Sequence, residues 1–134
     1  MMGSDVEPAC RFCLANGLLD DAPLFGNDSC YFLASADPVL QHGGMIIPRR
    51  HTATPFELTE AEWRDTFALL AEAKTWLDAT MPDGYTLGWN VGRVGGQTVD
   101  HTHLHIIARF ADEPLAGQGL RHHLKQPGNR RPGR

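Results

Sequence analysis

The chain of 134 residues has no long hydrophobic run, and this absence excludes one large class of proteins. No segment approaches the roughly 18 consecutive apolar residues that a membrane-spanning helix needs. The first ten residues, MMGSDVEPAC, are polar where a secretory signal peptide carries an apolar stretch. We therefore expect a cytoplasmic protein with no membrane partner.

Cysteine is scarce, with three in the chain. Three thiols cannot form a complete disulfide framework, which excludes the small secreted proteins that such bonds hold together. Cys10 and Cys13 form the motif CRFC, and in a reducing compartment this spacing indicates metal binding or redox chemistry. Cys30, in DSCYFL, fits a buried or half-buried strand.

An excess of positive charge is also missing. The chain has 12 Lys and Arg against 16 Asp and Glu, a formal net charge of −4, so we expect no nucleic-acid partner. Its length corresponds to one domain that can bury a core. We assign this domain to residues 10–125, between a flexible N-terminal tail at 1–9 and a flexible C-terminal tail at 126–134 that is rich in Pro, Gly and Arg.

The hydrophobic pattern predicts an antiparallel α+β domain. Short apolar runs between turn residues predict strands at 30–34, 44–48 and 85–90, and a fourth strand is expected at 99–110. One helix follows Thr59, which forms a capping box with Glu62, and it ends before Pro82. The apolar residues that recur at the spacing of one helical face are Trp63, Phe67, Leu70, Ala73 and Leu77.

Three of the seven histidines alternate in VDHTHLHIIARF, residues 99–110. In a strand, His101, His103 and His105 lie on one face about 6 to 7 Å apart, where they can contact one extended substrate. Two alternatives are a solvated strand face and a three-histidine zinc site. The hydrophobic opposite face argues against the first, and alternate positions on one strand diverge too far to share one small ion.

A glycine-rich turn, NVGRVGGQTVDH, precedes these histidines. Its glycines allow the backbone to approach a ligand closely, while Asn90, Gln97 and Thr98 supply neutral hydrogen-bonding groups. The combination predicts a phosphate cradle. Taken without the histidines, such a turn is more typical of an ordinary hairpin connection.

The segment GGQTVDHTHLHII resembles the signature of the histidine triad (HIT) family, in which three alternating histidines follow Gly-Gln-Ser/Thr-Val. MIIPRRH, residues 45–51, is similar to the family's Val-Ile-Pro-Lys-x-His segment, and Asn90 stands where the family has an asparagine. The similarity spans residues 10 to 110. It implies a HIT-like fold, an antiparallel five-stranded sheet with one main helix and a short one, and a homodimer.

The resemblance also implies an activity. HIT proteins cleave at the α-phosphorus of nucleotides, and here the substrate would be an adenosine-containing phosphoramidate or dinucleoside polyphosphate. His103 would be the nucleophile that forms a covalent nucleotidyl-histidine, because an imidazole with the ordinary pKa of about 6.5 is largely uncharged at neutral pH. His105 would contact the phosphate or the bridging oxygen. The residues that the resemblance places against the phosphate are Asn90, Gly96, Gln97, Thr98, His103 and His105.

A subset of HIT proteins resembles this chain in having an N-terminal Cys-x-x-Cys. The resemblance implies a structural zinc ion held by Cys10, Cys13, His51 and His101. Two free thiols or a redox pair are the alternatives for CRFC. A rival to the enzyme as a whole is a zinc-stabilised nucleotide-binding protein with little turnover that acts through partners, against which the intact triad and turn argue.

Two segments depart from the family pattern or lie beyond it. LASADPV, residues 33–39, stands where many members have an Asp-Ile pair, and HGG, residues 42–44, replaces Gly-His. Near the end of the chain, GLRHHLK, residues 119–125, is interpreted either as a segment that folds over the site or as an exposed basic tail, and the tail is favoured.

Overall fold

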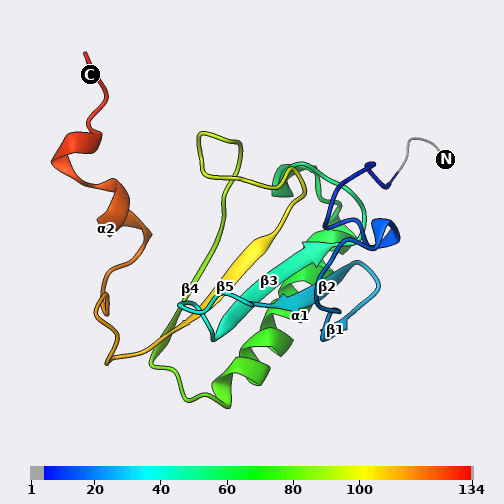
Figure 1. Ribbon diagram of the computed structural model, residues 1–134, viewed down its shortest axis with the longest axis horizontal. Helices are drawn as coiled ribbons and strands as arrows, with labels where there is room; N and C mark the ends of the chain where they lie inside the picture. The colour runs from blue at the N-terminus through cyan, green and yellow to red at the C-terminus, as the bar shows by residue number, and fades with distance from the viewer. Residues whose placement is uncertain (1–4, 134) are drawn as a thin grey trace.

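The computed structural model describes residues 5–133, so part of each expected tail, residues 1–4 and 134, lies outside the described residues. Five antiparallel strands form one sheet in the order β1-β2-β3-β5-β4 (Figure 1). One long helix and one short helix accompany the sheet, which confirms the expected α+β architecture. The strands are β1 (Phe25–Gly26), β2 (Cys30–Ala34), β3 (Gly43–Pro48), β4 (Gly84–Trp89) and β5 (Leu104–Arg109), and the helices are α1 (Glu60–Asp78) and α2 (Leu120–Leu124).

Both faces of the central strands are covered. Leu69, Ala73 and Leu77 of α1 pack on one face of the sheet, against Phe32 of β2 and Ile106 of β5. The N-terminal segment covers the opposite face, where the buried ring of Phe12 packs on Tyr31, Leu33 and Ile47. This double covering explains why β2 and β3 are nearly continuous apolar runs instead of alternating ones. Cys30 is fully buried in β2, as its sequence context predicts.

The helix begins where the sequence predicts it, but it is rotated relative to the predicted apolar face. The amide of Glu62 donates to the Thr59 hydroxyl, and the carboxylate of Glu62 accepts from the Thr59 amide, which completes the capping box. The buried side of α1 includes Glu62, whereas Trp63 and Phe67 are 41% and 73% exposed. Ala73 and Leu77 are buried as predicted, whereas Thr66 and Leu69 are the buried residues in the part of the helix where Trp63 and Phe67 were expected.

The fourth predicted strand is shorter than expected, because β5 begins at Leu104. His101 and His103 therefore precede the strand, and the prediction that all three histidines alternate on one strand is wrong. The antiparallel pairing of β3 with β5 stops at Ile46 opposite Leu104. Continued pairing would bring Pro48 into the ladder, and proline has no amide hydrogen to donate. The chain before Leu104 is held by other contacts, which build the site.

The C-terminal segment extends away from the sheet (Figure 1). Residues 119–133, which include α2, are all exposed. In this chain the segment GLRHHLK therefore does not cover the histidines, and it corresponds to the exposed basic tail. None of the helices within residues 5–133 combines the length and the apolar character that crossing a membrane requires.

Candidate functional site

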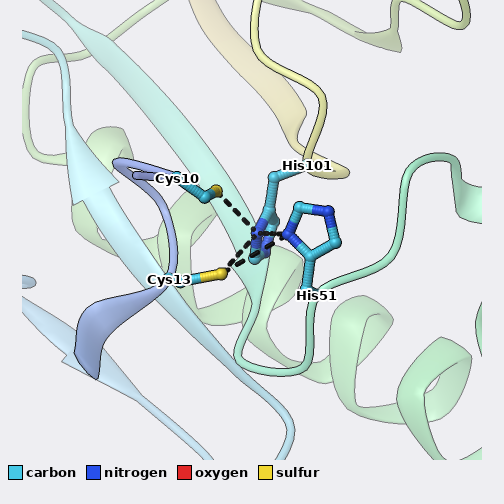
Figure 2. A group of neighbouring side chains, drawn as sticks. All are labelled: Cys10, Cys13, His51 and His101. Carbon is cyan, nitrogen blue, oxygen red and sulfur yellow. Dashed lines mark hydrogen bonds between the residues drawn. The ribbon is translucent and has the colours of Figure 1, made fainter. Parts of the chain in front are cut away.

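Four candidate metal ligands converge from three segments that are distant in sequence (Figure 2). Cys10 and Cys13 come from the N-terminal loop, His51 follows β3, and His101 precedes β5. One ligand atom from each side chain lies within 4.8 Å of the other three. The Nδ1 atoms of the two imidazoles are 3.1 Å apart, and each thiol sulfur lies 3.4 Å from an imidazole nitrogen.

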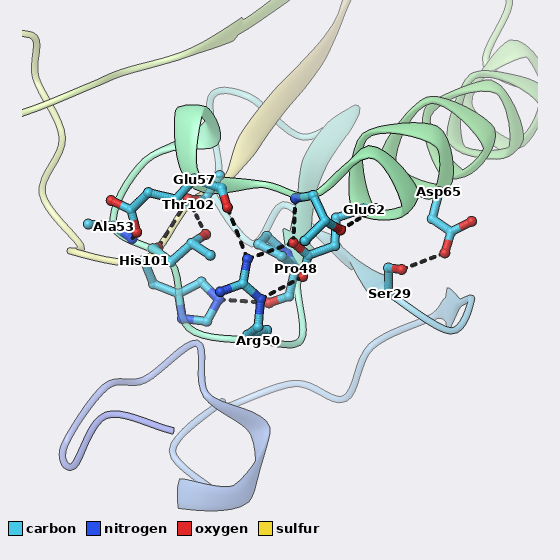
Figure 3. A network of polar contacts seen from close by, with 11 residues as sticks. Ser29, Pro48, Arg50, Ala53, Glu57, Glu62, Asp65, His101 and Thr102 are labelled. Carbon is cyan, nitrogen blue, oxygen red and sulfur yellow. Dashed lines mark hydrogen bonds and ion pairs between the residues drawn. The ribbon is translucent and has the colours of Figure 1, made fainter. Parts of the chain in front are cut away.

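These separations fit a tetrahedral metal ion. Ligand atoms with bonds of about 2.0 Å to nitrogen and about 2.3 Å to sulfur lie about 3.3 to 3.8 Å apart around such an ion. The Nε2–H of His101 donates to the carbonyl of Pro48 at 2.7 Å, which leaves the Nδ1 lone pair directed at the cluster (Figure 3). Burial lowers the pKa of His101 to about 4, so this imidazole is a neutral ligand at neutral pH. Four ligands complete a tetrahedral shell.

The central histidine of the triad is held in one orientation. His103 is buried, and its Nδ1–H donates to the carbonyl oxygen of His101 at 2.7 Å. Nε2 therefore carries the free lone pair of the ring. The ring of Phe12 packs edge-on against His103, with centroids 5.2 Å apart. The arrangement orients Nε2, and an oriented nitrogen lone pair is what nucleophilic attack requires.

His105 lies next to His103 and is the second residue of β5. Its ring centroid is 5.1 Å from that of His103. Burial lowers the pKa of His105, with a smaller contribution from His103, so the ring is uncharged at neutral pH and has one N–H to donate. The two rings thus offer one nucleophile and one neutral hydrogen-bonding group within reach of a single phosphate.

A cavity of about 310 Å³ adjoins His105. It lies on the sheet face opposite α1, and its size is near the lower limit for a small-molecule site. Its walls combine apolar side chains with one cation and several carboxylates. The residues that characterise it are Arg11, Asp20, Leu33, Asp37, Met45 and Ile107. Sequence reasoning missed Arg11 and Asp20, and no local pattern in the N-terminal segment signals a pocket wall.

The glycine-rich turn is built around Gln97. Its side-chain amide donates to the carbonyls of Ala53 and Val99, at 2.7 and 3.0 Å, and its oxygen accepts from the amide of Gly92. Both N–H donors of this buried side chain are therefore engaged with the backbone. The expected phosphate contact from Gln97 would require breaking one of these bonds, so in this arrangement the residue shapes the turn.

Asn90 and Thr98 remain available at the turn, whereas the Gly96 amide donates to the carbonyl of Arg93 at 3.0 Å. Gly96 has φ +99°, a conformation that favours glycine, and a Cβ there would lie 3.5 Å from Asn90 Cγ. Asn90 is half-buried at the end of β4, and Thr98 is exposed. Among the predicted residues, the structure brings Asn90 next to Gly96 and holds Gln97 beneath the turn.

An ion pair ties the metal-ligand loop to the start of α1 (Figure 3). Arg50 donates from Nε and Nη2 to the two carboxylate oxygens of Glu62, at 3.0 and 2.7 Å. The same guanidinium donates to the carbonyl of Glu57. Because Arg50 immediately precedes His51, the capping box of α1 and the position of a metal ligand share one network. The capping box was predictable from the sequence, but this pairing was not.

Acidification should weaken this network. The hydrogen bond from Arg50 lowers the pKa of Glu62 below its ordinary 4.5, so the pairing stabilises the fold above that pH and is lost as the pH falls through the lower, folded-state pKa. Glu62→Gln should reduce the free energy of unfolding at pH 7 by about 1 kcal/mol and make stability less pH-dependent below 4.5. Urea unfolding from pH 3 to 7 measures this. Glu60→Gln, in the same helical turn, is the control, and equal pH dependence of the two variants would contradict the assignment.

Comparison with known proteins agrees with the geometry. The family model of the HIT domain matches residues 18–112. An adenylylsulfatase from Arabidopsis thaliana is 30% identical over 125 residues, which cover 90% of this chain and 62% of that protein. An adenosine 5'-monophosphoramidase from Schizosaccharomyces pombe is 33% identical over 82 residues, 61% of this chain and 59% of that protein. The chain thus spans less than two thirds of the length of either relative.

The fold also matches solved structures. A HIT family protein from Bacillus anthracis superposes with a TM-score of 0.71 and 26% identity, over 80% of this chain and 77% of that one. A protein from Streptococcus mutans shares the fold, with a TM-score of 0.74 at 23% identity over 88% of this chain and 76% of that one. The family match contains the oriented His103, its neighbour His105 and the turn around Gln97. The chain therefore belongs to the HIT domain family.

Proposed function

We propose that this protein is a nucleotide hydrolase or nucleotidyl transferase that uses His103 as a covalent nucleophile. The observation that carries the proposal is the 2.7 Å hydrogen bond from His103 Nδ1 to the carbonyl of His101, because it leaves Nε2 free and oriented. The two relatives described above are named for reactions of adenosine 5'-phosphate derivatives, which supports an adenosine-containing substrate.

The chemistry proceeds in two displacements. Nε2 of His103 attacks the α-phosphorus, a phosphorus–nitrogen bond forms, and the bond to the leaving group breaks. Water or another acceptor then attacks the same phosphorus, which releases the nucleotide and restores the free imidazole. His105 donates a hydrogen bond to the phosphate or the bridging oxygen, and Asn90 and Thr98 supply further neutral donors, while Gly96, which has no side chain, leaves room for the phosphate. The nucleoside occupies the cavity beside His105.

We assign the metal cluster to a structural zinc ion. Two thiolates and two imidazoles in a tetrahedral arrangement are ligands that zinc prefers. Cys10, Cys13, His51 and His101 would hold the ion, and with four protein ligands its role is to fix the loops that carry them. His101 then links the ion to the active site, since its backbone carbonyl orients His103.

The proposal is tested with the wild-type protein and a panel of adenosine phosphoramidate, adenylylsulfate, and diadenosine tri- and tetraphosphate. We expect AMP release from at least one compound. Denaturation at alkaline pH during turnover, which preserves a phosphorus–nitrogen bond to histidine, should trap one nucleotidyl group, labelled at the α-phosphate, on the peptide that contains His103. Failure to release AMP from any compound, or turnover with the label on another peptide, would reject the mechanism.

We also propose a homodimer formed along the free edge of β4. An apolar patch flanks this edge, where Trp63 and Phe67 of α1 and Leu87 of β4 are 41%, 73% and 48% exposed. The ring of Trp63 packs edge-on against Trp89, so the patch is continuous across the two elements. An edge strand with apolar neighbours is suited to antiparallel pairing with its own copy around a twofold axis.

Phe67→Glu should separate the dimer. A buried, unpaired carboxylate in an apolar interface costs several kcal/mol. We therefore expect the dissociation constant of the dimer to rise by at least about 100-fold. Analytical ultracentrifugation over a concentration series measures the change. Phe56→Glu is the control, because Phe56 is 82% exposed on a short turn at Pro55–Glu57, outside the patch. A wild-type monomer at high concentration would refute the interface.

A further inference from the structure

Two identical dipeptides, His51-Thr52 and His101-Thr102, lie side by side in the structure although 50 residues separate them. In each dipeptide the histidine is a candidate metal ligand, and the threonine that follows is buried, with 1% of Thr52 and 2% of Thr102 exposed. The two hydroxyl oxygens are 2.7 Å apart. None of the chemistry proposed above uses these hydroxyl groups.

The directions of the hydrogen bonds follow from the partners. Thr102 Oγ1 donates to the carbonyl of Thr52 at 3.0 Å, so its single proton is committed. The bond between the hydroxyls must then run from Thr52 Oγ1 to Thr102 Oγ1. The amide of Thr102 donates to the same Thr52 carbonyl at 2.8 Å. Three hydrogen bonds therefore join this one pair of residues in a region without access to water.

The pair stands where the regular sheet has ended. Pairing of β3 with β5 stops before Pro48, so the ladder does not connect the loop of His51 with the loop of His101 and His103. Hydrogen bonds from His101 to the Pro48 carbonyl and from Gln97 to the Ala53 carbonyl connect the two loops at single points, and the three Thr52–Thr102 bonds connect them directly beside both histidines. A shift of either loop would change the 3.1 Å separation of the two Nδ1 atoms and would move the His101 carbonyl that orients His103.

We propose that the buried hydroxyl pair of Thr52 and Thr102 positions the metal ligands and the nucleophile relative to one another. Thr52 places His51, while Thr102 places His101 on one side and His103 on the other. Both are positioning residues, since they act through the histidines beside them. The inference rests on the proposed metal site and nucleophile, and it assigns the spacing of both to one pair of side chains.

Metal affinity tests the first half of the proposal. Thr102→Val keeps the shape of the side chain but leaves the Thr52 hydroxyl without its acceptor. It should weaken binding of Co²⁺, the probe metal, by about 10- to 100-fold, as measured by competition with a chelator. Thr102→Ser, which keeps the hydroxyl group, should bind Co²⁺ as tightly as wild type. Thr52→Val removes one of the three bonds and should have a smaller effect. It replaces Thr102→Val in the test if that variant does not fold. Thr66→Val is the control, because Thr66 is also buried, with 5% exposed, but lies in α1.

The orientation of His103 tests the second half, independently of metal and turnover. In NMR spectra the Nδ1 proton of wild-type His103 should exchange slowly with solvent, and in Thr102→Val it should exchange at least about 10-fold faster, with Thr102→Ser close to wild type. With substrate, kcat should fall while KM stays the same. The inference would be overturned if Co²⁺ affinity and proton exchange were unchanged in Thr102→Val, or if they changed equally in Thr66→Val. A wild-type protein that does not bind Co²⁺ would also overturn it. A wild-type protein that binds Co²⁺ and protects the Nδ1 proton of His103 but releases no AMP would reject the proposed function and leave this inference standing.

Discussion

Alanine in place of His103 should lower the rate of AMP release by at least about 10³-fold, because the variant has no nitrogen with which to form the covalent intermediate. Substrate binding should be nearly unchanged, since the cavity is lined by other residues. Steady-state kinetics on the best compound of the adenosine panel measures the rate, and isothermal titration with AMP measures the binding. A fall in kcat with an unaltered AMP affinity is the expected signature.

A smaller variant makes the test more specific. His103→Gly leaves space for added imidazole, which should restore part of the rate by attacking in place of the missing side chain. His42→Ala is the matched control, because His42 is exposed and its ring packs on Phe110 instead of lining the cavity. Full activity of His103→Ala, or an equal loss in His42→Ala, would show that another group attacks the phosphorus.

Serine at both Cys10 and Cys13 should remove the metal ion and a large part of the stability. When the free metal concentration is 100 to 1,000 times the Kd, binding stabilises the fold by about 3 to 4 kcal/mol. Loss of the ion should then lower the melting temperature by roughly 10 to 20 °C. The N-terminal segment should loosen as well, because the packing of Phe12 on the sheet and on His103 depends on the adjacent ligands. Metal analysis and calorimetry measure the two effects.

Cys30→Ser provides the control for this pair. Cys30 is also a buried cysteine, but it belongs to the core between the sheet and α1 and not to the metal cluster. The control should lose some stability through its effect on packing and should keep about one zinc ion per chain. A native protein without metal, or a double variant as stable as Cys30→Ser, would refute the structural role of the ion.

Local patterns predicted most of the elements because their signals are short-range. The capping box at Thr59 and Glu62 formed as predicted, and the apolar runs became β2, β3 and β4 nearly at the expected residues. Resemblance to the HIT family supplied the five-stranded sheet. Each predicted metal ligand either belongs to the CRFC motif or lies near the end of a strand. The fold brings these positions together.

The incorrect predictions arose where contacts with other segments of the chain override a local sequence pattern. Helical periodicity placed Trp63 and Phe67 on the buried face, whereas contact with the sheet buries Leu69, Ala73 and Leu77 and leaves Trp63 and Phe67 exposed. The alternation of the triad predicted that all three histidines lie on one strand, but the missing amide of Pro48 ended the ladder before His103. The sheet residues that α1 packs against, and Pro48 opposite the triad, lie outside the short stretch of sequence in which each pattern is read.

The sequence by itself determined which chemistry is present: the CRFC thiols, the alternating histidines and the glycine-rich turn, each recognisable from residues that are close in the chain. Tertiary structure decided how that chemistry is arranged. It joined His101 to Pro48 so that one nitrogen faces the thiols, and it turned His103 onto the carbonyl of His101 so that Nε2 is free. The first contact joins residues 53 positions apart and the second turns the chain back over two positions, and both depend on backbone geometry that only folding sets.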